Sequence, residues 1–240
     1  MKLKFIGTRG NIEAKNRRHR RHSSLLVSYD NQNLMIDCGK DWRGNFQKYS
    51  PQAILLTHAH PDHAFGLKDG APCPVYATST SWTKLDDLEI DDKRKLSTDK
   101  RHMVKGIEVK ACTVEHSLKA PAVGFRMKAG RHQIFYAPDL VYIHERSRAL
   151  KGVDVYIGDG ATIDRSFVRK RGDYLIGHAP VRTQLTWCQK ENVDFALITH
   201  CGSQIVESDE RKLGAKLHRM AGERGVSAKI AYDGMETVLS

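Results

Sequence analysis

Short runs of apolar residues alternate with polar turns along most of this chain, and this pattern predicts many β-strands and few helices. We expect one helix from Pro180 through Gln189 and a second over residues 207–223. Residues 75–76 follow two prolines and predict a short edge strand. The strand pattern as a whole covers residues 2–6, 25–27, 34–36, 53–56, 75–76, 107–113, 122–127, 133–137, 153–157, 195–198, 228–231 and 236–239.

Three segments lack a strand pattern. Residues 11–22 are polar and predict a loop, and residues 164–173 are basic and predict an irregular segment. Residues 79–101 are charged and predict helix in part. No linker, low-complexity tract or change of composition divides the chain. We therefore expect one α/β (α+β) domain over residues 1–240, made of two packed sheets with helices outside them.

The composition is typical of a soluble enzyme, with 40% hydrophobic and 28% charged residues. No apolar run approaches the length that spans a bilayer, and residues 1–6 have the pattern of a first strand rather than a signal peptide. The five cysteines are scattered, odd in number and without a C-x-x-C pair. They favour buried thiols in a reducing cytoplasm over a disulfide framework or a thiolate zinc site.

The net charge of +11 suits a polyanionic substrate such as nucleic acid, although a generally basic proteome would give the same value. Part of this charge lies in the stretch from Lys15 to His22, where no apolar period occurs. Its cations are candidate anion-binding residues, and the alternative is a solvated loop. These cations are Lys15, Arg17, Arg18, Arg20 and Arg21.

Three histidines and a carboxylate follow the apolar residues 53–56 as His58-Ala59-His60-Pro61-Asp62-His63. Neutral imidazole and carboxylate are preferred ligands of zinc and similar divalent ions. Side chains this close on a loop at a strand end can all face one small volume. The alternative is a polar surface loop that happens to be rich in histidine. The apolar strand before the motif and the glycine turn at Gly66 after it favour a metal site.

Four further candidates, Asp37, His116, Asp139 and His200, each come just after an apolar strand. If these strands are neighbours, their ends form one rim, and loops at such a rim carry function on a rigid scaffold. Taken singly, each residue would more often be a capping aspartate or a satisfied histidine. Their repeated placement is what indicates a site. His178 precedes Ala179-Pro180, and its position alone favours a residue that caps or packs on a helix start.

Together these residues resemble the metallo-β-lactamase superfamily over nearly the whole chain. The resemblance implies a four-layer αββα sandwich with two divalent metal ions, zinc or else manganese, between the sheets. Asp37 would be the carboxylate that orients a ligand imidazole. The resemblance further implies that His58, His60 and His116 hold the first ion, that Asp62, His63 and His200 hold the second, and that Asp139 bridges both.

Other stretches are similar to phosphodiesterases of this superfamily. The resemblance implies that His178 lies beside the metals and faces the substrate, and that Asp62 and His178 are catalytic. His116-Ser117, Gly124-Phe125, Asp139, His178, Thr199-His200 and Tyr232-Asp233-Gly234-Met235-Glu236 are similar to the phosphoribosyl cyclic phosphodiesterase. Gly7-Thr8-x-Gly10 and Ser23-Ser24-Leu25 are similar to the transfer-RNA 3′-processing endonuclease, tRNase Z.

We therefore predict a dinuclear metal-dependent phosphodiesterase or nuclease, acting on nucleic acid, nucleotide or cyclic phosphate substrates by attack of a metal-bound hydroxide. A thioester, lactone or β-lactam hydrolase on the same fold is the first alternative. A non-catalytic nucleic-acid-binding domain with a structural metal is the second, although closed structural zinc sites usually use cysteine. No membrane partner is expected. The oligomeric state stays open, and a homo-oligomer is compatible with the sequence.

Overall fold

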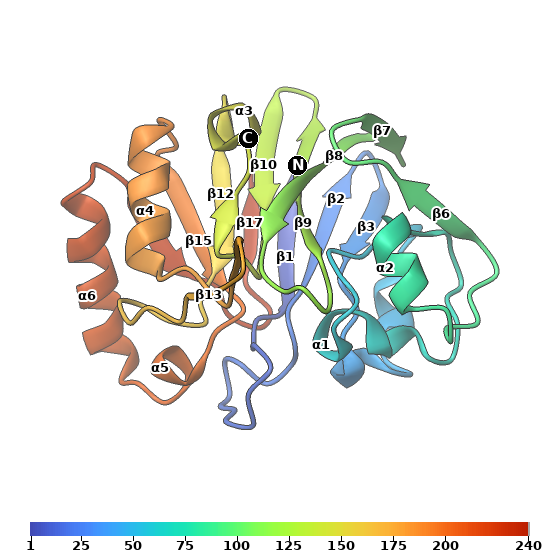
Figure 1. Ribbon diagram of the computed structural model, residues 1–240, viewed down its shortest axis with the longest axis horizontal. Helices are drawn as coiled ribbons and strands as arrows, with labels where there is room; N and C mark the ends of the chain where they lie inside the picture. The colour runs from blue at the N-terminus through green and yellow to red at the C-terminus, as the bar shows by residue number, and fades with distance from the viewer. Residues whose placement is uncertain (240) are drawn as a thin grey trace.

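The computed structural model describes residues 1–239, which form two mixed β-sheets packed face to face between two layers of helices (Figure 1). Helices α4 (Val181–Lys190) and α6 (Glu210–Gly222) cover one sheet from outside, and α1 (Pro61–Ala64) and α2 (Ser79–Lys84) lie outside the other. The predicted αββα sandwich is therefore confirmed. Every helix among the described residues is too short or too polar to cross a membrane.

The first sheet has the strand order β17-β1-β2-β3-β4-β5-β6. Its strands β1 to β3 are antiparallel, whereas β3 to β6 run parallel. Because β5 pairs with both β4 and β6, the predicted edge position of residues 75–76 is wrong. The two prolines precede the paired residues, so they remove no donor from the ladder. The strands are β1 (Lys2–Gly7), β2 (Ser24–Tyr29), β3 (Gln32–Ile36), β4 (Ala53–Leu55), β5 (Val75–Thr78), β6 (Lys93–Leu96) and β17 (Glu236–Val238).

The second sheet has the order β11-β8-β9-β10-β12-β15-β16, and β7 also pairs with β8. Its strands β10, β12, β15 and β16 run parallel, so their carboxyl ends lie at one edge. The strands are β7 (Arg101–Val104), β8 (Ile107–Glu115), β9 (Ala122–Ala129), β10 (His132–Tyr136), β11 (Tyr142–Ile143), β12 (Val155–Asp159), β15 (Phe195–Thr199) and β16 (Ser227–Ile230).

Some of the remaining segments differ from the sequence expectations. The segment predicted to be irregular contains β13 (Arg169–Arg171), which pairs with β14 (Tyr174–Ile176) in a separate two-stranded hairpin. The charged segment 79–101 holds α2, β6 and the start of β7. Helix α6 begins at Glu210 rather than at residue 207, because the Asp209 side chain accepts the Lys212 N–H and caps its first turn. The other short elements are α3 (Arg146–Leu150), α5 (Ser203–Val206), η1 (Lys40–Trp42), η2 (Phe46–Tyr49) and η3 (Phe65–Leu67).

Three apolar layers hold these elements together. The central layer lies between the sheets and includes the fully buried Phe5, Phe125 and Ile134. The outer layers fill the space between each sheet and its helices, around Trp42 on one side and Leu185 on the other. Burial of each such side chain contributes about 1.5 to 3 kcal/mol, so the strand ends have a rigid base. The five cysteines are all free thiols, four of them buried and Cys73 half-buried.

Candidate metal centre

Strand ends of both sheets bring the candidate residues to one rim of the sandwich, as the strand-end pattern predicted. Asp37 follows β3, and the histidine motif follows β4. From the second sheet, His116 follows β8, Asp139 lies three residues after β10, and His200 follows β15. Asp37 and His200 both have left-handed backbone conformations, with φ of 61° and 50°. Such conformations are uncommon outside glycine and recur where a functional side chain must turn inward.

The histidine motif is partly helical rather than an open loop. Pro61 occupies the first position of α1, where a missing N–H costs nothing, and the N–H groups of His63 and Ala64 donate to the His60 carbonyl. This single turn buries the side chains of Asp62 and His63, while His58 and His60 approach from the preceding segment. The change from strand to helix is therefore what lets closely spaced side chains face one volume.

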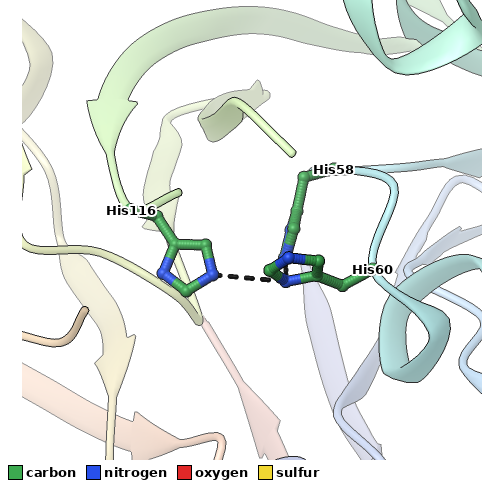
Figure 2. Close-up of side chains that lie close together, drawn as sticks. All are labelled: His58, His60 and His116. Atoms are coloured by element: carbon green, nitrogen blue, oxygen red, sulfur yellow. Dashed lines mark hydrogen bonds between the residues drawn. The ribbon is translucent and has the colours of Figure 1, made fainter. Parts of the chain in front are cut away.

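The first donor group, His58, His60 and His116, consists only of imidazoles (Figure 2). His60 Nδ1 lies 2.9 Å from His58 Nε2 and 3.3 Å from His116 Nε2. His58 and His116 use Nδ1 elsewhere: the former lies 2.9 Å from Thr57 Oγ1, and the latter donates to the Gly177 carbonyl at 3.0 Å. Their Nε2 lone pairs therefore face the centre of the group.

The second donor group, Asp62, His63, Asp139 and His200, combines two carboxylates with two imidazoles. Asp139 lies at its centre. One of its oxygens, Oδ2, is 2.7 Å from His63 Nε2 and 3.5 Å from His58 Nε2 of the first group, and Oδ1 is 3.2 Å from His200 Nδ1. Asp62 Oδ2 lies 3.3 Å from His200 Nε2. Asp139 is thus the carboxylate that contacts both groups.

Asp37 is fully buried behind the second group, in the position expected of an orienting carboxylate. It accepts His63 Nδ1–H at 2.9 Å and the Thr57 N–H at 2.8 Å. This contact fixes the tautomer of His63 and directs its Nε2 inward.

His178 lies in the same rim, although its position before Pro180 favoured a capping role. Its Nδ1 donates to Asp159 Oδ2 at 2.8 Å and lies 3.3 Å from Asp139 Oδ1. Asp159 is the site residue that sequence reasoning missed. It ends β12 between two glycines, so the same strand-end pattern could have found it. Asp159 also accepts the N–H groups of Leu140 and Ala161, which occupy both of its oxygens.

The donor chemistry fits metal ions. Within residues 1–239, His63 Nε2, His200 Nδ1 and Asp139 Oδ1 are buried and make no hydrogen bond, although each lies close to another donor atom. Short contacts without hydrogen-bond geometry are expected where lone pairs converge on a cation. Ligands of a tetrahedral zinc with bonds of 2.0 to 2.1 Å lie about 3.3 Å apart, which is close to the separations in both groups.

The electrostatics of the two groups differ. Burial lowers the pKa of the imidazoles in the first group, and neighbouring imidazoles add to this, bringing His60 to about 4. Burial also disfavours charge on His63 and His200, but carboxylates such as Asp62 and Asp139 outweigh it. The pKa of His200 rises to about 10, and that of His63 lies well above its ordinary value. The second group thus attracts positive charge strongly.

A cavity of about 460 Å³ opens onto both groups. His60, Asp62, Asp139 and His178 are among its walls, and Arg165 and Phe167 from the segment before β13 line it on another side, together with residues 10–12. The rim is therefore accessible to a substrate.

The basic stretch lies beside this cavity and does not line it. Arg18 pairs with Glu210 and stacks on Tyr232, and Arg21 donates to the Asp41 carbonyl and stacks on Trp42. The remaining cations of the stretch are exposed, and these are Lys15, Arg17 and Arg20. Two of the five candidate anion-binding residues thus already have partners within the chain.

Comparisons with known proteins relate most of the chain to one superfamily. The beta-lactamase superfamily domain matches residues 32–201. A ribonuclease Z from Methanopyrus kandleri is 27% identical over 200 residues, covering 70% of each chain. Ribonuclease Z from Methanococcus aeolicus is 36% identical over 72 residues, which span only 21% of that protein.

Solved structures share the fold over nearly the full chain. The metallo-beta-lactamase fold protein YhfI from Bacillus subtilis superposes with a TM-score of 0.77 at 18% identity, covering 98% of both chains. A diphosphatase from the PhnP family superposes with a TM-score of 0.75 at 16% identity, covering 100% of this chain and 98% of that one.

Proposed function

Because this chain belongs to the beta-lactamase superfamily and is a metal-dependent hydrolase, we propose that it hydrolyses phosphodiesters in nucleic acid, nucleotide or cyclic phosphate substrates. The observation that carries the proposal is the placement of Asp139 and His178. Asp139 contacts both donor groups, and His178 faces the same cavity with a buried carboxylate behind it. The name of the relative from Methanopyrus kandleri supports a nucleic-acid substrate.

We propose that the two donor groups hold two divalent ions, with zinc as the resident metal and manganese as a substitute. His58, His60 and His116 would hold one, Asp62, His63 and His200 would hold the other, and Asp139 would contact both. Charge supports this count. Four aspartates are buried in the rim, namely Asp37, Asp62, Asp139 and Asp159. Their four negative charges would be balanced by the four positive charges of two divalent cations. Buried charges require such compensation.

When bound, divalent ions lower the pKa of a water molecule and stabilise negative charge on phosphoryl oxygens. The residues of the chain supply the rest. Asp139 and Asp62 line the cavity and would help to hold the ions that position the nucleophilic water and the phosphoryl group there. His178 has its Nδ1 proton engaged by Asp159, so its Nε2 is the atom that can donate a proton to the departing oxygen.

Asp159 acts on His178 as an orienting residue. Its carboxylate is held by two backbone N–H groups, and its own N–H donates to the buried Gln184 Oε1 at 2.9 Å. An aspartate held by these three contacts keeps the imidazole in one tautomer and one orientation. The carboxylate also raises the pKa of His178, against the effect of burial, which favours a protonated imidazole as a proton donor.

We further infer that residues 1–240 act as one domain, because one apolar layer is shared by both sheets and the rim takes residues from each. A reducing compartment such as the cytoplasm suits five free thiols.

The proposal is tested by assaying purified, zinc- or manganese-loaded protein on bis(p-nitrophenyl) phosphate beside a thioester and a lactone. We expect turnover of the phosphodiester well above that of both carbonyl substrates. Asp139→Ala serves as the control for contaminating hydrolases, and His218→Ala, at an exposed histidine of α6, controls for substitution as such. Preference for the thioester or lactone would contradict the proposal.

A further inference from the structure

The β13–β14 hairpin and the residues that lead into it carry exposed aromatic and cationic side chains. Phe167 is 41% exposed and Tyr174 is 59% exposed. Four cations accompany them, and none makes an ion pair within residues 1–239, whereas the neighbouring Asp164 pairs with Lys216. Exposed aromatic side chains beside such cations supply both a stacking surface and positive charge. The four cations are Arg165, Arg169, Lys170 and Arg171.

The root of this hairpin is fixed to the candidate metal centre. The Gly177 N–H donates to the His116 carbonyl at 2.9 Å, and His116 Nδ1–H donates back to the Gly177 carbonyl. Gly177 has a φ of 110°, and a Cβ at this position would lie 2.0 Å from the Phe167 carbonyl, so only glycine fits. The Leu175 N–H also donates to Glu115 Oε2 at 2.9 Å. The exposed part of the hairpin thus has a defined position relative to the donor groups.

The hairpin also extends the cavity beyond the donor groups. A second hollow of about 350 Å³ is lined by Phe167, Arg169 and Ile176, and it shares Phe167 and His178 with the first cavity. The two hollows meet at the imidazole proposed to protonate the leaving oxygen. A substrate that continues past the cleaved bond would therefore pass Phe167 and reach the cations of β13.

We propose that residues 165–177 bind single-stranded nucleic acid next to the cleaved phosphodiester, with bases on Phe167 and Tyr174 and phosphates on Arg169, Lys170 and Arg171. This inference rests on the proposed function, since it places the polymer in the same active site. Aromatic side chains interleaved with cations are the usual means of binding single strands without sequence readout. A small cyclic phosphate would reach only the first hollow and would leave the β13 cations unused.

The test is fluorescence anisotropy of labelled U12 RNA and T12 DNA with the metal-loaded full chain, over a range of salt concentrations. A denaturing gel of each sample shows whether the oligonucleotide is cut, and where it is cut the dependence of the cleavage rate on protein concentration replaces the anisotropy reading. The first variant, Arg169→Ser/Lys170→Ser/Arg171→Ser, removes charge, and the second, Phe167→Ala/Tyr174→Ala, removes stacking. The matched control, Lys84→Ser/Lys95→Ser/Lys100→Ser, removes three exposed charges from the segment around α2 and β6.

We expect the charge variant to weaken binding at least tenfold at low salt and to flatten the slope of log affinity against log salt by about 2, because each phosphate contact on a single strand contributes about 0.7. The aromatic variant should weaken binding at least about thirtyfold with the slope unchanged, since it removes two stacked bases and each is worth about 1 to 3 kcal/mol. The control should stay within about threefold of wild type. Comparing U12 with T12 distinguishes RNA from DNA as the preferred strand.

Binding and slope that change no more in the hairpin variants than in the control would overturn the inference. Circular dichroism and the thermal midpoint establish that each variant is folded. Hydrolysis of bis(p-nitrophenyl) phosphate by the wild-type chain separates the two proposals. Turnover of this ester without hairpin-dependent binding refutes the hairpin site alone. Hairpin-dependent binding without any turnover refutes the proposed phosphodiesterase activity alone.

Discussion

The carboxylate side of the rim, around His63, His178 and His200, and the basic stretch give histidine opposite electrostatic surroundings. In the rim, His63, His178 and His200 face buried carboxylates, which raise the imidazole pKa in spite of burial. In the basic stretch, burial lowers the pKa of His19 and of His22 to about 4, and a nearby arginine adds to the effect at each. Asp41, which lies 2.9 Å from His22 Nδ1, opposes this shift without overcoming it. The carboxylate side of the rim therefore attracts cations, whereas the basic stretch, like the all-imidazole group of the rim, keeps its imidazoles neutral.

The carboxylates of the two regions explain this difference. Near the basic stretch, Asp41 is engaged by Arg9, and Asp233 accepts the backbone N–H groups of Arg20 and Arg21. In the rim, the side-chain partners of Asp62 and Asp139 among the described residues are all imidazoles, and Asp139 Oδ1 accepts no hydrogen bond from these residues. Abundance of histidine therefore does not identify a metal site. A metal site is identified by imidazole lone pairs that face inward beside carboxylates that have no other partner.

The largest expected effect comes from the carboxylate that contacts both donor groups. Asp139→Ala should lower phosphodiester turnover at least about a thousandfold, because charge stabilisation by bound ions is worth several kcal/mol. Elemental analysis of the variant should find less metal, and circular dichroism should find the fold retained. Asp86→Ala, at an exposed carboxylate between α2 and β6, is the matched control. Full activity in Asp139→Ala would show that the rim takes no part in catalysis.

His178→Ala should keep the bound metal and lower kcat by about 100-fold on an alkyl phosphodiester, the usual scale for losing a general acid. The loss should be smaller on a nitrophenyl ester, because that leaving group needs no proton. Equal losses on both substrates would indicate phosphate binding instead. Loss of metal from His178→Ala would indicate that His178 is a metal ligand. Unchanged activity of the variant would indicate a structural role alone.

Asp159→Asn should lower kcat by about 30-fold, within the 10- to 100-fold range typical of residues that orient a metal-site or catalytic imidazole. The effect should disappear in the double variant with His178→Ala, because an orienting residue acts only through its imidazole. Additive losses in the double variant would assign Asp159 an independent role, and metal analysis would then test whether it is a ligand.

In the basic stretch, the expected effect is on stability rather than activity. His19 Nδ1 lies 2.8 Å from Thr8 Oγ1, which donates to Asp233 Oδ1. The pKa of His19 is about 4 in the folded chain, below the ordinary 6.5, so the unfolded chain takes up the proton first as pH falls. The stability of the folded chain that depends on a neutral His19 is fully present above pH 6.5. It is lost as the pH falls from 6.5 to 4.

His19→Gln should therefore reduce the loss of unfolding free energy between pH 7 and 5 by about 1 to 2 kcal/mol. Urea unfolding of both chains at the two pH values, at one zinc concentration, measures this. An identical pH dependence in wild type and variant would place the pH sensitivity elsewhere.

The sequence predicted the layers and the rim because its strands are short apolar runs that end at aspartate or histidine. Asp159 was not predicted as a site residue because an aspartate between two glycines is equally typical of a plain turn. The β13–β14 hairpin was missed since Arg169–Arg171 has no apolar alternation, and its position depends on hydrogen bonds to Glu115 and His116 far away in sequence. The partners of Arg18 and Arg21 are likewise distant, so the sequence could not indicate which cations are free.

The central claim is that the rim holds two divalent ions, and metal stoichiometry of the purified full chain tests it most directly. The first and second donor groups together contain seven residues, more than the four ligands that a single tetrahedral zinc takes. Elemental analysis after extensive desalting, with and without prior addition of zinc or manganese, should find about two ions per chain. A value of one or less, unchanged when either metal is added, would contradict the two-ion site.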